Sequence, residues 1–392
     1  MTLAAGELAI DLTLRDGVVD AVQLASTRPQ VADALLRGRP ADEAVALLPR
    51  LFSICGRAHG LAAELAVEAA RGAPSAAAAP AQSGSPDRPD RLDRPDRPDR
   101  SDGPDRLARL EAELAHELLW RTLLDWPRLL GEPADADALA RVRTALASGE
   151  RSALRTAIEQ TVLAGPAAPW WEHEHVPAFE IWVAQARTVA ARVLAAVQRD
   201  GARHGAPRAP VALLPAPPAA ADLASIDAAL TRDAQFELRP ELDGAPAETG
   251  TVARLQAHPL VAALTRAYGR SALTRLAARI TELARIACGA PAGQPLFGAL
   301  ALDAQRGLGW VETARGLLVH VAHLQGDRVA QWRIVAPTEW NFHPRGALLQ
   351  GLIGAHAVGA ADLAQRAQWL VQSLDPCVSY RVRVNGSELA HA

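Results

Sequence analysis

Lysine is absent from this chain of 392 residues: all 41 basic side chains are arginine, and 44 acidic side chains bring the net charge to −3. A charge so close to neutrality gives no support for binding nucleic acid through bulk electrostatics. We interpret the exclusive use of arginine as a codon bias rather than as selection for guanidinium chemistry.

Cysteine is also scarce. The three cysteines, Cys55, Cys288 and Cys377, are few and odd in number, so a disulfide framework is not expected. Reduced thiols in a cytoplasmic protein are expected instead. Residues 1–12 lack a basic region followed by an apolar run, and no stretch of about 18 apolar residues occurs, so neither a signal peptide nor a membrane span is predicted. With 49% hydrophobic residues, the chain can still bury a sizeable core.

Several common catalytic motifs are missing from the sequence. The pair His116-Glu117 has no second histidine four residues later, so it is not a zinc-protease motif. Residues 307–309 read G-L-G, but no lysine partner follows, so they do not form a phosphate-binding glycine loop. The G-x-S-x-G motif of serine hydrolases is also absent.

Hydrophobic spacing predicts a mostly α fold with small β-hairpins, in the α+β class. The predicted hairpins are Leu8–Val22, turning at residues 15–17, and Leu317–Leu324 with Val329–Val335. The predicted helical ranges are 41–71, with Cys55 near a helix boundary, 107–130, 135–163, 178–199, 252–287, broken near Gly269, and 348–371, interrupted by glycines.

Composition divides the chain into five segments: 1–72, an insertion at 73–106, a helical region at 107–200, a Pro/Ala-rich connection at 201–250, and 251–392. Within the insertion, Ser85–Arg106 repeats Pro-Asp-Arg and cannot bury enough apolar surface to fold alone. We interpret it as a flexible insertion, and a docking strap for a partner is the alternative.

Two cysteine motifs lie near opposite ends of the chain. Residues 53–60 read S-I-C-G-R-A-H-G, and residues 373–380 read S-L-D-P-C-V-S-Y. They resemble the R-I-C-G-x-C and D-P-C-x-x-C motifs of the nickel–iron hydrogenase large subunit, whose four thiolates hold the metal centre. Cys55 and Cys377 match the terminal nickel ligands. The first bridging cysteine falls in a three-residue deletion before His59, and Tyr380 occupies the position of the second.

Other segments resemble the same family in the family's order, and the likeness implies the large-subunit fold. They are Leu35–Pro40 (I-L-x-G-R-P), His59–Glu68 (H-A-L-A-x-x-x-A-V-E), Gly307–Gly316 (G-x-G-x-x-E-A-P-R-G) followed by His320, and Pro337–Arg345 (P-T-T-W-N-x-x-P-R). The region between about Pro74 and Gly250 carries little of the resemblance.

Departures from the family pattern predict that the chain does not turn over hydrogen and holds no nickel. The phenol of Tyr380 is a poor bridge between soft metals. The family's proton-relay glutamate falls at Val31, and Arg383, which stays protonated, replaces a histidine ligand. Only a short polar end follows Arg383, which leaves little of the tail that family precursors lose after nickel insertion.

The retained residues imply a different task. Arg315, Pro337 and Thr338 match residues that in the family surround the iron and its cyanide and carbonyl ligands, and a guanidinium and a hydroxyl suit bound cyanide because it accepts hydrogen bonds. Glu312 and His320 are assigned to the same pocket. Their alternative role is to stabilise the structure. The pattern resembles HupK/HoxV-type hydrogenase maturation proteins. It implies a non-catalytic scaffold that transiently carries or helps to assemble the iron–cyanide–carbonyl unit.

The resemblance implies two kinds of partner: accessory proteins that build and deliver the iron unit, and the precursor of the hydrogenase large subunit. The alternative is a metal-free structural homologue that serves as an interaction subunit. It predicts no effect of replacing the cysteines.

Each candidate residue also has a plain structural interpretation. Cys55 and Cys377 can be metal ligands or buried structural thiols, whereas Cys288 lies outside any motif and is expected in the core. His59 can ligate metal or orient the loop, and orientation is preferred. Residues 170–175, W-W-E-H-E-H, can bind an ion or form an acidic surface beside packed tryptophans, and the surface is preferred.

Overall fold

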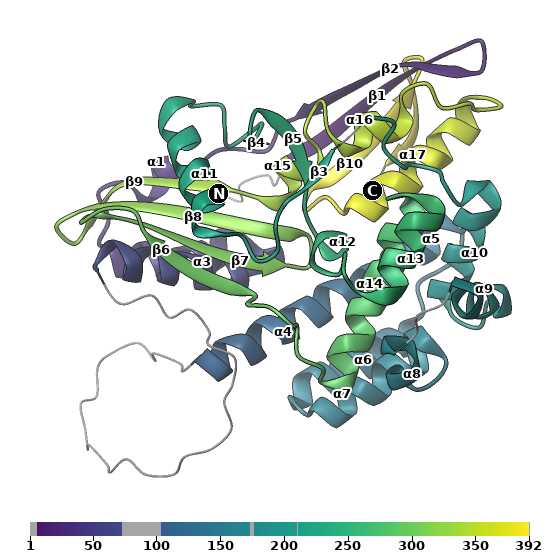
Figure 1. Cartoon of the computed structure of the whole chain (residues 1–392), viewed down its shortest axis with the longest axis horizontal. Coiled ribbons are helices and arrows are strands. Elements are labelled where there is room, and N and C mark those ends of the chain that lie inside the picture. The colour runs from purple at the N-terminus through teal and green to yellow at the C-terminus, as the bar shows by residue number, and fades with distance from the viewer. Residues whose placement is uncertain (1–5, 73–102, 173–175, 210, 392) are drawn as a thin grey trace.

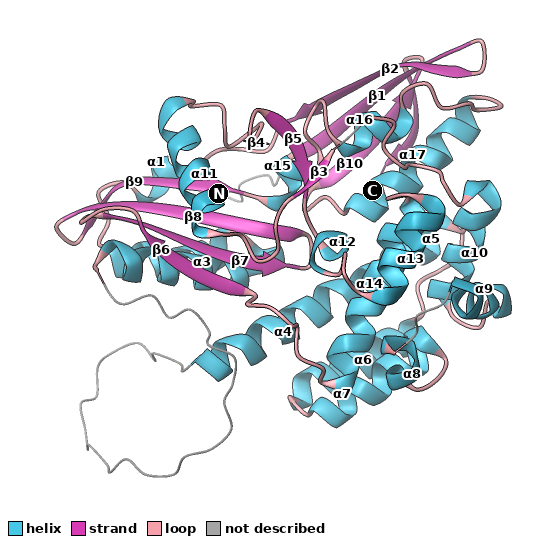
Figure 2. Ribbon diagram, viewed as in Figure 1, coloured by secondary structure: helices cyan, strands magenta, loops and turns pink. Residues whose placement is uncertain are grey.

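The computed structural model describes residues 6–72, 103–172, 176–209 and 211–391. Helices and two four-stranded sheets share the chain, which confirms the predicted α+β class (Figure 2). Most of the Pro-Asp-Arg tract lies outside the described residues. Its last part is helical, because helix α4 begins at Gly103 rather than after residue 106.

The first sheet joins the two ends of the chain. Its order is β11-β10-β1-β2, formed by β1 (Glu7–Arg15), β2 (Val18–Ser26), β10 (Ser379–Val384) and β11 (Ser387–His391). The β1–β2 hairpin confirms the predicted turn, in which Asp16 and Gly17 have positive φ. Strand β10, which sequence analysis did not predict, pairs in parallel with β1 and places Tyr380 opposite Leu8 (Figure 1). This pairing brings the second cysteine motif back to the amino-terminal part of the fold.

The second sheet is an antiparallel meander in the order β6-β7-β8-β9. Its strands are β6 (Phe297–Ala301), β7 (Arg306–Thr313), β8 (Gly316–Gln325) and β9 (Arg328–Val335). The β8–β9 hairpin was predicted, whereas β6 and β7 were not. Helix α3 (Gly56–Ala70) packs across β7 and β8. A Cβ at Gly307 would lie 2.2 Å from the Ala66 carbonyl oxygen, and one at Gly309 would lie 2.1 Å from that of Ala62. Both glycines are therefore needed for this close approach.

The helical half surrounds α14 (Ala272–Cys288), whose Ala272–Ala287 part is buried throughout. Its other elements are α4 (Gly103–Trp120), a π-helical turn (Arg121–Asp125), α5 (Trp126–Leu129), α6 (Ala136–Ser148), α7 (Arg151–Ile158), a second π-helical turn (Glu159–Leu163), α8 (Ala167–Trp171), α9 (Val176–Gln185), α10 (Val189–Gly201), α12 (Thr251–Arg254) and α13 (Pro259–Tyr268). The predicted break near Gly269 is present. The single helix expected over 178–199 is wrong, because the chain breaks at Ala186, with φ of 50°, and Thr188 caps α10.

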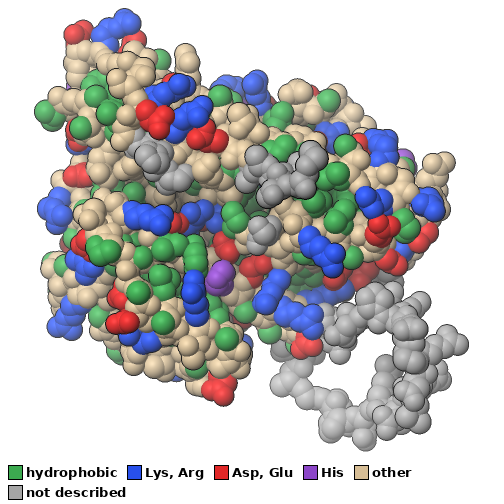
Figure 3. Space-filling model, turned by 180° about the vertical axis from the view of Figure 1, so that it is seen from behind, with side chains coloured by type: hydrophobic (Ala, Val, Ile, Leu, Met, Phe, Trp, Pro, Cys, Tyr) green, Lys and Arg blue, Asp and Glu red, His purple; other side chains and the backbone are tan. Residues whose placement is uncertain are grey.

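The remaining elements connect these parts. They are α1 (Ala32–Leu36), α2 (Ala41–Leu51), a 3-10 turn (Ser53–Cys55), α11 (Ala220–Arg232), the small strands β3 (Ala212–Leu213), β4 (Glu241–Leu242) and β5 (Ala245–Glu248), α15 (Pro337–Asn341), α16 (Ala347–Leu352) and α17 (Ala360–Leu374). On the face shown in Figure 3, arginine and acidic side chains are interspersed with apolar ones. Within the described residues, no helix is both long and apolar enough to cross a bilayer.

Candidate functional site

The two motif cysteines occupy the ends of two helices. Cys55 is the last residue of the 3-10 turn and precedes α3, while Cys377 follows α17. Both are partly buried and unpaired. Burial raises the pKa of the Cys55 thiol to about 12, Arg315 acts in the opposite direction, and Cys377 adds to the increase. Each thiol therefore lies within electrostatic range of the other, although 321 positions separate them in the chain.

Thr338 fixes Cys377 through two hydrogen bonds. The Thr338 hydroxyl donates to the Cys377 Sγ at 3.1 Å, and the Cys377 backbone N–H donates to the same hydroxyl at 3.2 Å. Pro337 begins α15 and so holds Thr338 in its first turn. The Asn341 side chain donates to the carbonyls of Arg315 and Leu374, at 3.2 and 3.3 Å, so it joins the β7–β8 turn to the end of α17.

A carboxylate from α4 holds the helix that follows Cys55. The Glu113 oxygens accept hydrogen bonds from the backbone N–H groups of Arg57 and Ala58, at 2.8 and 2.9 Å. These are two of the unpaired donors in the first turn of α3, where a negative charge is also favoured by the helix dipole. Burial raises the pKa of Glu113, and its two backbone hydrogen bonds act in the opposite direction.

Two guanidinium groups, that of the buried Arg315 and that of the partly buried Arg28, lie within electrostatic range of the thiols. Arg28 pairs with Glu339 at 3.1 Å, and Arg315 pairs with Glu117 at 3.0 Å. Burial alone would lower the pKa of Arg28, but Cys377, Glu339 and Cys55 together raise it. The pKa of Arg315 is raised in the same way, by Asp375, Glu117 and both cysteines. The Nη1 atom of Arg315 is buried and has no hydrogen-bond partner among the described residues.

Asp375 anchors the loop that carries Cys377. It has φ of 56° and lies 2.7 Å from Arg279, 2.8 Å from Arg121 and 3.5 Å from Arg315. These three arginines hold the pKa of the Asp375 carboxyl well below its usual range, against the effect of burial. Arg121 also donates to the carbonyl of Pro376 at 2.8 Å. The second motif is therefore fixed to the helical half by an ionic network.

His59, His320 and Trp332 form a directed hydrogen-bond chain. The Trp332 indole can only donate, and it lies 3.2 Å from Nδ1 of His320. Neutral His320 therefore carries its proton on Nε2, which lies 2.9 Å from Nδ1 of His59. Burial lowers the pKa of His320 to about 3 and that of His59 well below its usual value, so both stay neutral. Since this bond uses Nδ1 of His59, the arrangement favours the orienting role of His59.

Glu312 contacts a different ionic cluster. It is buried and pairs with Arg254 at 3.0 Å, which lies 3.8 Å from Glu282, and Glu282 pairs with Arg285 at 2.9 Å. None of these contacts involves either motif cysteine. These ion pairs favour the structural role that was the alternative for Glu312.

Two residues at lost ligand positions have taken on structural contacts. The buried Tyr380 hydroxyl accepts a hydrogen bond from Gln372 at 3.1 Å. Arg383 pairs with Asp11 of the neighbouring strand, with Nη2 at 2.8 Å from Oδ2. Cys288 packs against the main core, as expected. Trp170 packs against Trp182 with ring centroids 4.6 Å apart, while residues 173–175 of the W-W-E-H-E-H tract lie outside the described residues.

Sequence reasoning missed several side chains that support the site. The residues concerned are Glu113, Glu117, Arg121, Arg279, Glu339 and Asp375. Asp375 and Glu339 stand inside motifs that were recognised, so their positions were available as a signal. Glu113, Glu117 and Arg121 lie in the region with little resemblance, where nothing in the sequence marked them.

Comparison with known proteins agrees with this architecture. Residues 235–382 match the family model of nickel-dependent hydrogenases. The chain is 34% identical to the hydrogenase expression/formation protein HoxV of Cupriavidus necator, covering 95% of this chain and 94% of that one. It is 32% identical to the hydrogenase expression/formation protein HupK of Rhizobium leguminosarum bv. viciae, covering 97% of each chain.

Solved structures show the same fold. A [NiFeSe] hydrogenase variant from Desulfovibrio vulgaris Hildenborough aligns over 93% of this chain and 94% of that one, with a TM-score of 0.53 and 15% identity. The enzyme from Desulfomicrobium baculatum aligns over 93% and 95%, with a TM-score of 0.52 and 16% identity. At such identities the likeness establishes the large-subunit fold alone.

Proposed function

This chain belongs to the family of hydrogenase expression/formation proteins that includes HoxV and HupK, and from that premise we propose that it is a non-catalytic scaffold whose cargo is an iron unit with cyanide and carbonyl ligands. Cys55 and Cys377 hold the iron of this cargo. The partners are the accessory proteins that build and deliver the unit and the large-subunit precursor that receives it.

The observation that carries the proposal is the unpaired donor of Arg315 beside the two thiols. Nη1 of Arg315 is buried without a hydrogen-bond partner in the described part of the chain, and a buried unpaired donor is costly. The cysteines contribute to the raised pKa of Arg315, so the guanidinium lies within their electrostatic range. A cyanide nitrogen on thiolate-bound iron would supply the missing acceptor. The Thr338 hydroxyl, whose oxygen lies 3.1 Å from the Cys377 Sγ, is a second polar group beside this thiol.

The small number of protein ligands suits a cargo better than a resident metal. Among the described residues, no group of three or more His, Cys, Asp or Glu side chains is placed to hold a metal ion. An iron that already carries diatomic ligands needs fewer bonds from the protein. Because the pKa of Cys55 is about 12, its thiol is protonated at neutral pH, and loading must release a proton from Cys55. Protonation would in turn help release the cargo.

Loss of both bridging positions supports the absence of catalysis and of nickel. The phenol of Tyr380 is bound to Gln372, and its pKa is raised by burial, so it is not a ready metal ligand. The three-residue deletion before His59 leaves Cys55 directly at the start of α3.

The test is an infrared spectrum of the protein purified together with its maturation partners. Cyanide and carbonyl bands should be present in the wild type and vanish in the Cys55→Ala, Cys377→Ala variant. The Cys288→Ala variant is the matched control and should keep them, because Cys288 ends α14 and the charges that act on its thiol are Arg155, Glu159 and Glu172, none of which belongs to either motif. Well-folded wild-type protein without these bands would instead support the metal-free interaction subunit.

A further inference from the structure

The segment between β2 and α1 brings one further cation to the cysteine site. Arg28 lies in this segment and pairs with Glu339 of α15, with Nη1 at 3.1 Å from Oε1. Their side chains keep 11% and 7% of their surface exposed, so the pair lies at the edge of the core. Glu339 follows Thr338, whose hydroxyl donates to the Cys377 Sγ. One turn of α15 therefore contacts both Arg28 and the second cysteine.

A small cavity beside this ion pair reaches the first cysteine motif. It has a volume of about 20 Å³, and Arg28, Glu339 and Phe52 belong to its lining. Phe52 directly precedes the 3-10 turn that ends at Cys55, and its ring stacks on that of His59 with the centroids 4.0 Å apart. A cavity of this size has room for about one water molecule. The ion pair therefore adjoins the segments that carry both motifs.

The guanidinium of Arg28 retains hydrogen-bonding capacity. An arginine side chain carries five N–H donors, and among the described residues only Nη1 of Arg28 is engaged, by Glu339. Burial lowers the pKa of Arg28, while Cys377, Glu339 and Cys55 raise it, and the charge effect of Cys377 is at least as large as that of Glu339. Arg28 therefore lies close to the Cys377 thiol and can still bind an anion.

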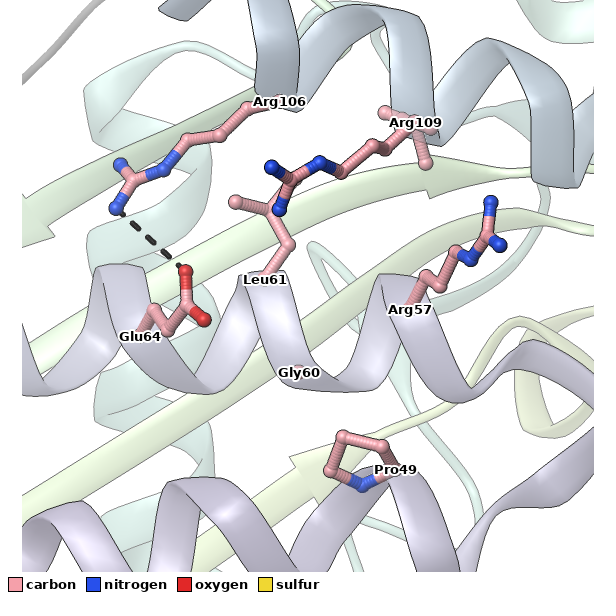
Figure 4. A pocket seen from close by; sticks show the side chains of 8 residues that line it. Pro49, Arg57, Gly60, Leu61, Glu64, Arg106 and Arg109 are labelled. Carbon is pink, nitrogen blue, oxygen red and sulfur yellow. Dashed lines mark ion pairs between the residues drawn. The ribbon is translucent and has the colours of Figure 1, made fainter. Parts of the chain in front are cut away.

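Arg57 is a weaker candidate for this task. It follows Cys55 by two residues, but its side chain lines the cleft between α3 and α4 (Figure 4). The charges with the largest effect on the Cys55 thiol do not include Arg57. Both thiols act instead on Arg315 and Arg28.

Loading of an iron unit would place two thiolates in this partly buried site. Negative charge that leaves water needs a nearby cation, because an uncompensated buried charge is costly. Arg315 already lies 3.0 Å from Glu117 and 3.5 Å from Asp375, whereas Arg28 pairs with one carboxylate. Of the two guanidinium groups, that of Arg28 therefore has more positive charge to offer.

The ion pair is not explained by the family likeness. Glu339 stands where the P-T-T-W-N pattern has its second threonine. A buried carboxylate at this position requires a cationic partner, which Arg28 supplies. The chain thus maintains a cation beside Cys377 through an acidic residue of its own.

We propose that Arg28 binds the cargo, with its guanidinium donating to the nitrogen of a cyanide ligand other than the one bound by Arg315, and that Glu339 is the positioning residue that holds it there. The identity of the ligand as cyanide on iron rests on the proposed function. An anion-binding group beside Cys377 does not, because it can be measured without iron.

Alkylation of Cys377 by an anionic and a neutral reagent measures that group. The reagents are iodoacetate and iodoacetamide, and mass spectrometry of the peptide that contains Cys377 gives the two rates. Their ratio cancels the ionised fraction of the thiol, which is the same for both. The ratio should fall roughly three-fold in Arg28→Met, as expected for the loss of one unit charge several ångströms away in water. Arg28→Lys should keep it, because the charge remains.

Arg333→Met is the matched control. Arg333 pairs with Glu237 at 2.8 Å, and each side chain keeps 14% of its surface exposed, so the variant breaks an ion pair of similar burial. Arg333 also donates to the carbonyl of Leu230, and none of these three residues belongs to either motif. An unchanged ratio in Arg28→Met, or an equal fall in the control, would overturn the proposal. If Arg28→Met does not fold, Arg28→Met, Glu339→Gln replaces it, because no buried carboxylate is then left unpaired.

Infrared spectra of the loaded protein test the bond to the cargo. One cyanide band should shift in Arg28→Met, because a hydrogen bond to the nitrogen changes the stretching frequency, and the band intensity should fall several-fold. Glu339→Gln keeps an acceptor for Arg28 and should shift the same band less. Bands that weaken without shifting would give Arg28 a structural role alone and overturn the proposed bond. Bands absent from the wild type would refute the iron cargo, and a ratio that still falls in Arg28→Met would then retain the anion site without it.

Discussion

The two cysteine motifs have lost their bridging positions in different ways, and the fold supports the surviving cysteines by different means. At Cys55 a deletion leads the chain directly into α3, which is held by packing on glycines of β7 and by the Glu113 cap. No hydrogen bond to the Cys55 thiol is found within the described residues. At Cys377 the thiol accepts a hydrogen bond from Thr338, and the loop is fixed by ion pairs to Asp375.

This difference shows that the position of a cysteine can be fixed by close packing or by a buried ionic network. The first depends on shape and on an apolar environment. The second depends on charges that must remain paired. The two regions should therefore respond to different perturbations.

The largest effect is expected from breaking the network at Cys377. Asp375→Asn removes the charge that pairs with the buried Arg279 and with the partly buried Arg121, and breaking a buried pair typically costs about 3–5 kcal/mol. The free energy of unfolding, measured in urea, should fall by that amount. Asp362→Asn breaks the more exposed pair with Arg366 and should cost less than about 1 kcal/mol. Equal losses in both variants would contradict the network's role.

Acid should weaken the region around Cys55 through the buried imidazoles. The pKa of His320 is about 3 in the fold, below its usual value of about 6.5, so the unfolded chain binds the extra proton first. This contribution to stability is present above pH 6.5 and is lost as the pH falls toward 3. At pH 5 the loss is roughly 2 kcal/mol for His320.

The His320→Gln variant isolates this effect. Although it is less stable overall, its unfolding free energy should change by about 2 kcal/mol less between pH 7 and pH 5 than that of the wild type. Parallel pH profiles of the two proteins would show that His320 is not the group responsible.

Helix α3 should be sensitive to a single added methyl group. Gly309→Ala places a Cβ where only 2.1 Å separates it from the Ala62 carbonyl oxygen, so α3 must move away from β7. Overpacking of this kind costs about 1–3 kcal/mol, measurable by thermal or urea unfolding. Gly165→Ala is the control, because a Cβ there meets nothing within 4 Å and its φ is not positive. A loss in the control that matched Gly309→Ala would argue against the steric cause.

The smallest effect is a chemical difference at Cys55 itself. Because the pKa of Cys55 is about 12, the fraction of its thiol that is ionised at pH 8 is far below that of an ordinary thiol. The higher nucleophilicity of a thiolate with a raised pKa offsets only part of this difference. Alkylation of Cys55 should therefore be roughly 30-fold slower than that of an unperturbed thiol. Mass spectrometry of the labelled peptide measures the rate, which should keep rising through pH 10. A plateau near pH 9 would contradict the raised pKa.

The sequence by itself determined the elements with strong local signals. The β1–β2 and β8–β9 hairpins, the helix boundary at Cys55 and the break at Gly269 all follow from alternation, helical spacing and turn residues. The motifs also singled out the two cysteines together with Arg315 and Thr338, which the fold places near them. These signals lie within a few neighbouring positions of the chain, so they can be detected without the fold.

Only the tertiary structure decided how distant segments meet. The parallel pairing of β1 with β10, the seat of α3 on Gly307 and Gly309, and the His59–His320 bond each join positions more than 200 residues apart. Some of the charges near the thiols come from α4 and α14, in which no motif marks Glu117 or Arg279. Such contacts depend on the relative positions of packed elements, and a linear pattern of residues does not contain that information.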